Sequence, residues 1–323
     1  MDYNEIQKLL SERAECRAKM NLIPFDGSIE VKEISGEKYL YARKREGGKN
    51  TSTYIDIYSE ERYETLTRQA VELRSLKKNI RRIEKRLAEL GYAEEEPSPG
   101  VLLNIDFARA NVKTLIYDQA VLEGISTTFP QTDAILENGV INGVRAQDVQ
   151  KILNLKHAWE FILDKDVVLS ESNFYVMAHI AGMINEGFYT NGGTIRSVPV
   201  SIGGTSYTPP IPLEADVKET IRAILQSEDD EVEKAIRLCL YCMKTQIFID
   251  GNKRASIIFA NHYMIQKGRG LLVVPEAKVD EFRKLLIAYY EGRDEDEIVR
   301  FFRDECWRRI QGANSTKQAA NAP

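Results

Sequence analysis

QIFIDGNKRA, residues 246–255, is the most informative stretch of this chain. It joins two helical patterns, Glu231 to Gln246 and Asn252 to Lys267, whose apolar residues recur with the period of a buried helix face. Between those helices, Asp250 to Arg254 combine a carboxylate, two cations and the free N–H groups of a helix N-terminus. Such groups suit a polyphosphate bound together with Mg2+. Asp-Gly-Asn alone is also a common turn, so the rest of the chain has to decide between the two interpretations.

The composition is that of a globular protein with a sizeable core. Of 323 residues, 43% are hydrophobic and 9% aromatic, enough for one large domain and an appendage. The net charge of −5 is uneven, because residues 1–90 carry 19 of the 44 Lys and Arg but only 16 of the 49 Asp and Glu. No apolar run approaches the roughly 18 residues of a membrane span, and the acidic start does not resemble a cationic leader. We therefore expect a cytoplasmic protein with no membrane partner.

The four cysteines do not indicate a disulfide framework or a metal site. Cys16, Cys239, Cys242 and Cys306 are few and scattered for a chain of this length. Cys239 and Cys242 form a CxxC, but the chain has no second pair to complete a zinc site. Cys239 also lies on the apolar stripe of a predicted helix, so we interpret it as a core residue.

The first 92 residues predict a small α+β module. A helix is expected over residues 2–20, followed by three strand-like runs, Ile29 to Ile34, Lys38 to Lys44 and Thr51 to Tyr58, joined by hairpin signals into an antiparallel sheet. From about Glu60 to Leu90 apolar residues recur every seven positions, which predicts a long helix with a coiled-coil-like seam. The seam consists of Leu66, Leu73, Leu76, Ile80, Ile83, Leu87 and Leu90.

The long heptad helix suggests two kinds of partner. Its seam could form a homodimer or dock another protein. The opposite side holds seven cations, Arg74, Lys77, Lys78, Arg81, Arg82, Lys85 and Arg86. No aromatic residues interleave with them, so a solvated helix face is preferred and nucleic acid is not an expected partner.

The remainder of the chain is expected to be mostly helical. AEEEPSPG, residues 93–100, has the composition of a linker, residues 101–311 form the main domain, and the small polar tail 312–323 is expected to be disordered. The predicted helices are Asp106 to Leu122, Phe129 to Asn138, Arg145 to Asp164, Glu171 to Asn185, Leu213 to Leu225, Glu231 to Gln246, Asn252 to Lys267, Val279 to Glu291 and Asp294 to Ile310. Thr194 to Pro210 alternates apolar and polar residues around Gly203-Gly204, which predicts an isolated β-hairpin.

The loop resembles the signature of the Fic/Doc family. That signature is a histidine, any residue, Phe, any residue, Asp or Glu, Gly-Asn or Ala-Asn, Gly or Lys, and Arg. The resemblance extends over most of residues 101–311. Leu122 to Glu137 is similar to the family's inhibitory-helix region, and Gly193 to Pro210 is similar to its β-hairpin flap. The resemblance implies a mainly α fold, with a Fic-type helical core behind the α+β N-terminal module.

The resemblance also implies an activity and its residues. Family members bind ATP with Mg2+ and transfer AMP, or in the Doc branch the terminal phosphate, to a hydroxyl of a target protein. Position by position, Phe248 would anchor the loop in the core and Asp250 would ligate the metal. The anion hole would be formed by Gly251, Asn252 and Lys253, and Arg254 would bind the β or γ phosphate. From the residues alone, Phe248 could equally be core filler and Arg254 a surface ion pair.

Two further elements would control access to the loop. Glu123, followed by Gly124, would be an autoinhibitory carboxylate near the nucleotide, although a capping residue would look the same. The flap, with Val198, Val200 and Ile202, would hold an unidentified target protein by strand addition.

The sequence departs from the family at four positions. Gln246 stands where the family has its histidine, and an amide cannot accept the proton of a target hydroxyl near neutral pH. Lys253 replaces a glycine and Ile257 replaces the second arginine, as in the Doc branch. Gln119 stands where the inhibitory motif has Ser or Thr. With Ile257 present, we expect Glu123 to lack its usual ion-pair partner.

Three functional hypotheses follow. The chain could bind Mg-ATP but be catalytically weak or inactive. It could instead be a working transferase, with a base such as His179, His262 or His157, or with Gln246 as a replacement that silences an active parent. Finally, the N-terminal module could be the functional part, with the core as a scaffold. We favour the first hypothesis because the phosphate-holding residues are present and the base is not.

Overall fold

Residues 3–46, 49–93, 95–137, 139, 141–293 and 295–310 are described by the computed structural model. Contacts between residues divide the chain into two units, Met1–Glu94 and Glu95–Pro323. The predicted tail, 312–323, lies outside the described residues, as do residues 47–48 of the second hairpin turn. No helix in the described ranges combines the length and apolar character needed to cross a membrane.

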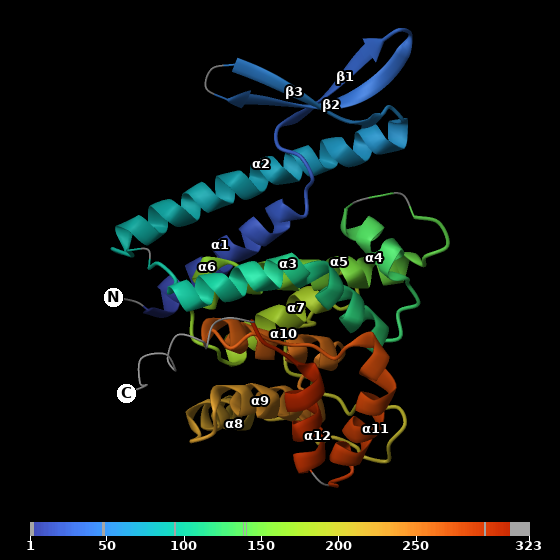
Figure 1. Cartoon of the computed structure of the whole chain (residues 1–323). Helices are drawn as coiled ribbons and strands as arrows, with labels where there is room; N and C mark the ends of the chain where they lie inside the picture. The colour runs from blue at the N-terminus through green and yellow to red at the C-terminus, as the bar shows by residue number, and fades with distance from the viewer. Residues whose placement is uncertain are drawn as a thin grey trace, which may run out of the picture. The chain divides into compact units, whose positions relative to one another are not determined.

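Unit 1 contains the helix, sheet and long helix predicted from the sequence (Figure 1). Helix α1 spans Tyr3–Asn21, and strands β1 (Ser28–Ile34), β2 (Glu37–Glu46) and β3 (Lys49–Ile57) form an antiparallel sheet in the order β1-β2-β3. Helix α2 spans Glu60–Glu89. Ser59 starts α2 because its side chain accepts a hydrogen bond from the N–H of Arg62.

The heptad seam of α2 is filled within unit 1. Its buried residues are Leu66, Ala70, Leu73, Leu76, Ile83 and Leu87. Helix α2 packs against α1 and β1, and Ile6 of α1 forms a cluster with Ile83 and Leu87. The seam is therefore covered by α1 and β1 and is not available for the homodimer that was predicted from it.

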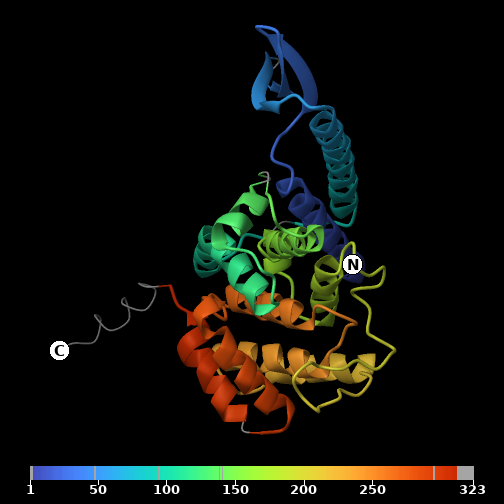
Figure 2. The ribbon, with the colours of Figure 1, turned by 90° about the vertical axis from the view of Figure 1, so that its right-hand side faces the viewer.

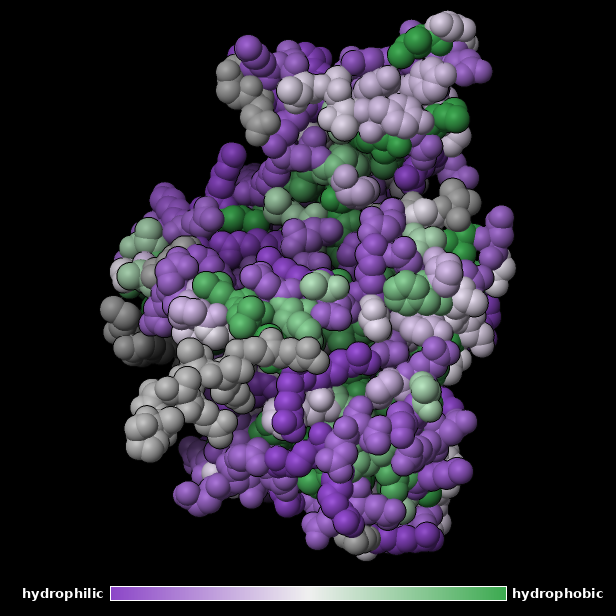
Figure 3. All heavy atoms as spheres, in the orientation of Figure 1, coloured by the Kyte–Doolittle hydropathy of each residue, from purple (hydrophilic) through white to green (hydrophobic). Residues whose placement is uncertain are grey.

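Unit 2 is mainly α-helical, as predicted (Figure 2). Its α-helices are α3 (Pro99–Leu122), α4 (Phe129–Leu136), α5 (Ala146–Ile162), α6 (Lys165–Val168), α7 (Phe174–Ile184), α8 (Glu214–Gln226), α9 (Glu231–Thr245), α10 (Asn252–Gln266), α11 (Val279–Tyr290) and α12 (Glu295–Phe301). A short 3-10 helix, Glu276–Lys278, precedes α11, and one π-helical segment, Phe302–Cys306, follows α12. Hydrophilic side chains dominate the molecular face in Figure 3, as expected when the apolar sides of the helices are buried.

Helix α10 is the centre of unit 2. It packs against α9 on one side and α5 and α7 on the other (Figure 2), and nearly all of its residues are buried. Its apolar side chains join α9 and α11 in the main core cluster, which includes Met243, Ile257 and Phe282. The loop before α10 therefore leads into a helix that is held in place by packing on several sides.

Two helix boundaries in unit 2 differ most from the predicted ones. Helix α3 begins at Pro99 instead of Asp106, because Ser98 caps it and proline is compatible with the first helical turn. The predicted linker therefore ends before Pro99. Helix α12 ends at Phe301, and the chain continues into β5 (Trp307–Arg308), which pairs with β4 (Leu271–Leu272). Strands of two residues are too short to leave a periodic pattern in the sequence.

Residues 194–210 do not form the β-hairpin predicted from the sequence. The segment consists of turns and irregular backbone without strand pairing. Pro199, Pro209 and Pro210 have no N–H group to donate to a ladder. Tyr207 and Ile202 instead turn toward the core cluster and pack against it. We keep the name flap for residues 194–210.

Candidate nucleotide-binding site at the start of helix α10

The motif loop, residues 246–251, is bounded by two residues with left-handed backbone conformation. Gln246 ends α9 with φ 48° and ψ 61°, and Gly251 precedes α10 with φ 73°. A Cβ atom on Gly251 would lie 2.6 Å from Cγ2 of Ile184, so only glycine fits there without a shift of α7. These two turns bring the N-terminus of α10 close to the end of α9.

Asn252 closes the motif loop with its side chain. Its Oδ1 accepts a hydrogen bond from the N–H of Phe248 at 2.9 Å, and its Nδ2 donates to the carbonyl of Phe248 at 2.8 Å and to Oε1 of Gln246 at 3.2 Å. Because this amide is engaged within the protein, Asn252 offers a ligand its backbone N–H and not its side chain. Phe248 is fully buried, which fixes the middle of the loop.

The side chain of Gln246 is turned toward its own surroundings. Its Nε2 donates a hydrogen bond of 2.7 Å to the carbonyl of Met243, one turn earlier in α9. Its Oε1 accepts the bond from Asn252. Both polar atoms of the residue at the family's histidine position therefore have partners in the two helices that flank the loop.

Two cations and two carboxylates meet at the first turn of α10. Nζ of Lys253 lies 3.5 Å from Oε1 of Glu123, and Nε of Arg254 lies 3.4 Å from Oε2 of Glu123. Nη2 of Arg254 also lies 3.3 Å from Oδ2 of Asp250. The Arg254 side chain is only 3% exposed, whereas Asp250 is 49% exposed. Arg254 is therefore a buried ion-pair residue, and the alternative of a surface ion pair is wrong.

The hydrogen-bonding capacity of this cluster is not fully used. Among the described residues, Nε of Arg254 and Oε1 of Glu123 are buried without a hydrogen-bond partner, because their ion-pair distances are long for hydrogen bonds. No side chain in the described part of the chain caps α10, so the N–H groups of its first turn face the same region. Unpaired buried donors of this kind need an explanation, and an anionic ligand supplies one.

The end of helix α3 places Glu123 over the two cations. Gly124 has φ 73° and donates its N–H to Val121, while the N–H of Ile125 reaches back to the carbonyl of Ala120. These two bonds form a Schellman end, which fixes the residue at the cap. Glu123 is that cap residue, so its backbone position is set by the last turn of the helix.

The residues that replace family positions have defined contacts. Ile257 is 2% exposed and belongs to the main core cluster, so this turn of α10 presents no cation. Glu123 therefore has no partner at position 257, as expected, and it pairs instead with Lys253 and Arg254. Gln119 accepts a hydrogen bond of 2.8 Å from Nε1 of Trp159 and donates to the carbonyl of Arg254 at 3.4 Å.

Arg196 connects the flap to the motif loop. Its guanidinium donates to the carbonyls of Val198 at 2.8 Å, of Pro210 at 2.6 Å and of Gln246 at 2.5 Å. Its backbone N–H donates to Ile247. Arg196 is 4% exposed, and burial lowers the pKa of its guanidinium. Arg196 lies within the flap expected from the sequence, but its role could not be predicted because its partners are backbone carbonyls that no motif reveals.

The flap residues named from the sequence differ in exposure. Val198 is 47% exposed, Val200 is half-buried, and Ile202 packs against the main core cluster. Only part of the flap is therefore open to a partner.

Asn185 also supports the loop, and sequence reasoning missed it. Its Nδ2 donates to the carbonyl of Asp250 at 3.0 Å and to that of Gly192 at 3.1 Å. A Cβ on Gly192 would lie 2.2 Å from Cβ of Asn185, so the glycine allows this close approach. The pair Gly192-Gly193 was the one available signal in the sequence.

The three histidines considered as substitute bases contact residues elsewhere in unit 2. His262 is fully buried, with Nδ1 2.8 Å from Oγ of Ser172 and Nε2 2.7 Å from the carbonyl of Val167. The ring of His179 stacks on Phe161 at 4.7 Å. His157 is buried with Nδ1 3.3 Å from Glu186. None of these contact partners belongs to the motif loop.

The burial of His262 predicts an acid-sensitive core. Burial lowers its pKa from 6.5 to about 4, so the unfolded chain binds this proton at a higher pH than the folded chain. The associated stability is complete above pH 6.5 and is lost as the pH falls toward 4, about 3 kcal/mol in all. Urea unfolding at pH 7 and pH 4.5 measures the loss. His262→Gln should show a smaller difference between the two pH values, and an unchanged difference would contradict the assignment.

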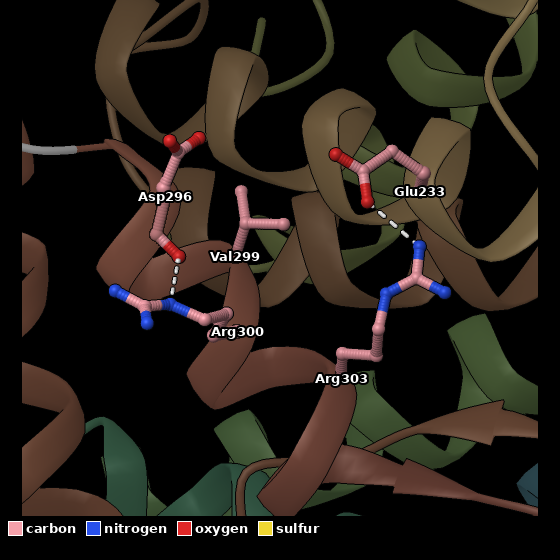
Figure 4. Close-up of a pocket in the computed structure, with 5 residues that line it drawn as sticks. All are labelled: Glu233, Asp296, Val299, Arg300 and Arg303. Carbon is pink, nitrogen blue, oxygen red and sulfur yellow. Dashed lines mark hydrogen bonds and ion pairs between the residues drawn. The ribbon is translucent and has the colours of Figure 1, made fainter.

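The pocket drawn in Figure 4 is a separate feature at the other end of α9. It is lined by Glu233, Asp296, Val299, Arg300 and Arg303. The guanidinium of Arg303 lies 2.7 Å from the carboxylate of Glu233, so the charge of Arg303 is neutralised within the pocket. Glu233 lies 13 residues before Gln246 in the sequence, about 20 Å along a helix. This pocket is therefore not part of the motif loop.

Comparisons with known proteins identify two matching segments of the chain. Residues 173–264 match the model of the Fic/DOC family, and residues 3–64 match a model described as a domain of unknown function (DUF6788). No curated protein matches the chain.

Three solved Fic structures resemble the fold. Fic-1 (amino acids 134–508) from C. elegans has 19% identity and a TM-score of 0.53, and the match covers 76% of this chain and 74% of that one. A Fic domain containing signaling protein from Bacteroides thetaiotaomicron has 15% identity and a TM-score of 0.51, with coverage of 65% of this chain and 85% of that one. A Fic family protein from Desulfovibrio desulfuricans has 14% identity and a TM-score of 0.50, with coverage of 65% of this chain and 73% of that one. At these identities they establish a shared fold. Residues 173–264, which contain the flap, the motif loop and most of α10, are a Fic/DOC family segment.

Proposed function

We propose that this protein binds Mg-ATP at the first turn of α10 and is impaired in the transfer step. Fic-domain proteins generally transfer AMP from ATP to other proteins. The observation that carries the proposal is the cluster of Lys253 and Arg254 on the single carboxylate of Glu123, beside the exposed Asp250. Phosphate oxygens would replace the Glu123 carboxylate on both cations.

The first turn of α10 fits a phosphate chain. Gly251 lets the chain turn into α10 close to Ile184, and the positive end of the helix dipole lies at this turn. The buried Nε of Arg254 has no hydrogen-bond partner among the described residues. A phosphate oxygen would give it a charge-assisted bond. The N–H groups of Asn252 and Lys253 would supply further donors.

The site fits Mg2+ only together with a nucleotide. Asp250 presents a half-exposed carboxylate, the kind of oxygen ligand that Mg2+ prefers. The described residues contain no group of three His, Cys, Asp or Glu that could hold a metal ion. Phosphate oxygens and water would complete the coordination, as in other nucleotide sites. The ion would neutralise charge on the phosphates.

The proton-accepting function is the weak part of the site. The amide of Gln246 is not basic, and its two polar atoms are bonded to Met243 and Asn252. Gln246 therefore supports the loop without taking a proton from a target hydroxyl. We expect the loss of general-base catalysis to lower the transfer rate on the order of 10² to 10⁴-fold.

The flap offers a place for the target protein. Val198 is 47% exposed, and the described backbone of residues 199–203 makes no backbone hydrogen bonds. An extended segment of a target could pair with this stretch by strand addition. Arg196 would hold that stretch beside the motif loop.

Removing the charge of Glu123 should strengthen nucleotide binding. In Glu123→Gln, Lys253 and Arg254 lose their shared carboxylate and remain available to phosphates. We expect MgATP to bind about tenfold more tightly, equivalent to about 1.4 kcal/mol, which is the scale of one charged hydrogen bond. Isothermal titration calorimetry with MgATP measures the change.

Glu137→Gln is the matched control, because Glu137 pairs with Lys113 and not with a cation of the phosphate site. It removes the same charge and should leave MgATP affinity unchanged. Equal affinity of Glu123→Gln and the parent chain would show that Glu123 does not compete with phosphate. Absence of MgATP binding by both the parent chain and Glu123→Gln would reject the proposed site.

A further inference from the structure

Helix α2 carries a row of cations on the side opposite its buried face. Arg74, Lys78, Arg81 and Lys85 follow at spacings of four, three and four residues, which places them in one line along a helix. All four residues are exposed. At 1.5 Å per residue the line is about 16 Å long. These four residues are called the α2 cation row.

Two of the cations beside the row, Lys77 and Arg86, are neutralised by carboxylates, whereas those in the row are not. Lys77 is paired with Asp26, and Arg86 lies 2.8 Å from Glu5 and 3.3 Å from Glu89. Within the described residues, no carboxylate forms an ion pair with a member of the row. The row therefore presents four uncompensated positive charges on one side of a single helix, in a chain whose net charge is −5.

The composition of this surface favours phosphates over a protein partner. The apolar side of α2 is covered by α1 and β1, so it is closed to a coiled-coil partner or a bilayer. Val71 is the large apolar residue that α2 exposes. Protein interfaces draw most of their affinity from a few Trp, Tyr and Arg side chains in well-packed, desolvated pockets, whereas the row is exposed and contains no aromatic residue. Nucleic acids draw much of theirs from contacts of cations to phosphates.

The sheet of the same unit adds an aromatic surface. The ring of Tyr54 lies 6.2 Å from that of Tyr39 and 5.8 Å from that of Tyr41, and Nζ of Lys32 lies 4.5 Å over the Tyr41 ring. Leu40, between the two β2 tyrosines, is fully buried on the other side. Nucleic acid was not expected because no aromatic residues interleave along α2. The structure places the aromatic residues on the sheet instead.

We propose that unit 1 binds nucleic acid, with the α2 cation row on the sugar-phosphate backbone and the sheet tyrosines stacking on unpaired bases. The row supplies charge without a fixed set of contacts to base edges, so binding should not depend on sequence. Stacking on aromatic rings also tolerates any base. This activity uses none of the residues of the ATP site.

The test is fluorescence anisotropy of the full chain with a labelled 20-nucleotide DNA of random sequence, as duplex and as single strand, in 50 to 300 mM NaCl. Four phosphate contacts predict a slope of about −3.6 for log Kobs against log salt with the duplex, and about −2.8 with the single strand. Arg81→Ala should reduce the duplex slope by about 0.9. Lys78→Glu with Arg81→Glu should weaken both forms at least about tenfold at 50 mM salt.

Tyr54→Ala tests the sheet separately. We expect it to weaken single-strand binding about fivefold or more, because one stacked base contributes roughly 1 to 3 kcal/mol. Duplex binding should not change, since its bases are already stacked. Unchanged single-strand binding would overturn the role given to the tyrosines.

The matched control reverses two charges in unit 2, Arg222→Glu with Lys284→Glu, both exposed. It changes the net charge by the same amount as the row variant and should leave DNA binding unchanged. Absence of binding at 50 mM salt, or an equal loss in the control, would overturn the proposal. If polyglutamate and unlabelled DNA, compared at equal concentrations of negative charge, displaced the labelled DNA equally well, the proposal would also be overturned, in favour of an acidic protein partner.

Discussion

A Gln246→His variant is expected to label proteins with ATP-derived groups about 10² to 10⁴-fold faster than the parent chain. The imidazole would restore a group that accepts the proton of the target hydroxyl near neutral pH. Histidine tolerates the left-handed backbone found at this position, so the replacement should leave the loop in place. Incubation of both proteins with α-labelled and γ-labelled ATP measures the rate. Label from the α position identifies AMP transfer, and label from the γ position alone identifies phosphate transfer.

The double variant Gln246→His with Arg254→Ala separates base chemistry from other effects. It retains the new histidine but lacks the buried cation of the phosphate site, so we expect its labelling to fall back toward the parent rate. Equal labelling by the parent and by Gln246→His would assign the base to another residue. Absence of label with both proteins, even with Glu123→Gln added to free the cations, would reject the transferase chemistry.

Gly251→Ala is expected to destabilise the protein by about 2 to 5 kcal/mol and to weaken MgATP binding at least about tenfold. The left-handed φ of 73° costs a residue with a side chain roughly 1 to 2 kcal/mol. The new Cβ would also lie 2.6 Å from Cγ2 of Ile184, which forces the loop or α7 to move at a cost of about 1 to 3 kcal/mol. Urea unfolding measures the first effect and calorimetry with MgATP the second.

Gly292→Ala isolates the backbone contribution. Gly292 has a similar φ of 79°, and its added Cβ would meet nothing within 4 Å. Its variant should lose only the roughly 1 to 2 kcal/mol of backbone strain and keep the parent affinity for MgATP. If the two variants lost equal stability, the contact with Ile184 would not constrain the loop.

The elements with a clear period were predictable, and the site's contacts were only partly so. The run of α9, motif loop and α10 follows from apolar spacing and from Asp-Gly-Asn, because both are local properties of the sequence. The start of α3 at Pro99 was missed because a proline in the first helical turn looks the same as one in a linker. The irregular flap was missed because alternation of apolar residues does not require a paired strand.

The contacts across the site depend on tertiary structure. Glu123 was placed near the nucleotide by resemblance, but its partners Lys253 and Arg254 are more than 125 residues away in the sequence. Arg196 and Asn185 act on backbone carbonyls of the loop. Any residue type supplies a carbonyl, so such pairs leave no chemical signature in the sequence.

Under the proposed competition between Glu123 and phosphate, the length of helix α3 becomes a determinant of nucleotide access. Glu123 is the residue at which α3 stops, and the Schellman bonds fix its orientation relative to the preceding turn. One residue inserted or deleted within α3 would rotate this carboxylate by about 100° and shift it by about 1.5 Å. Related chains that differ by a single residue in this helix would therefore differ in whether the phosphate site is occupied by their own carboxylate, even with an identical motif loop.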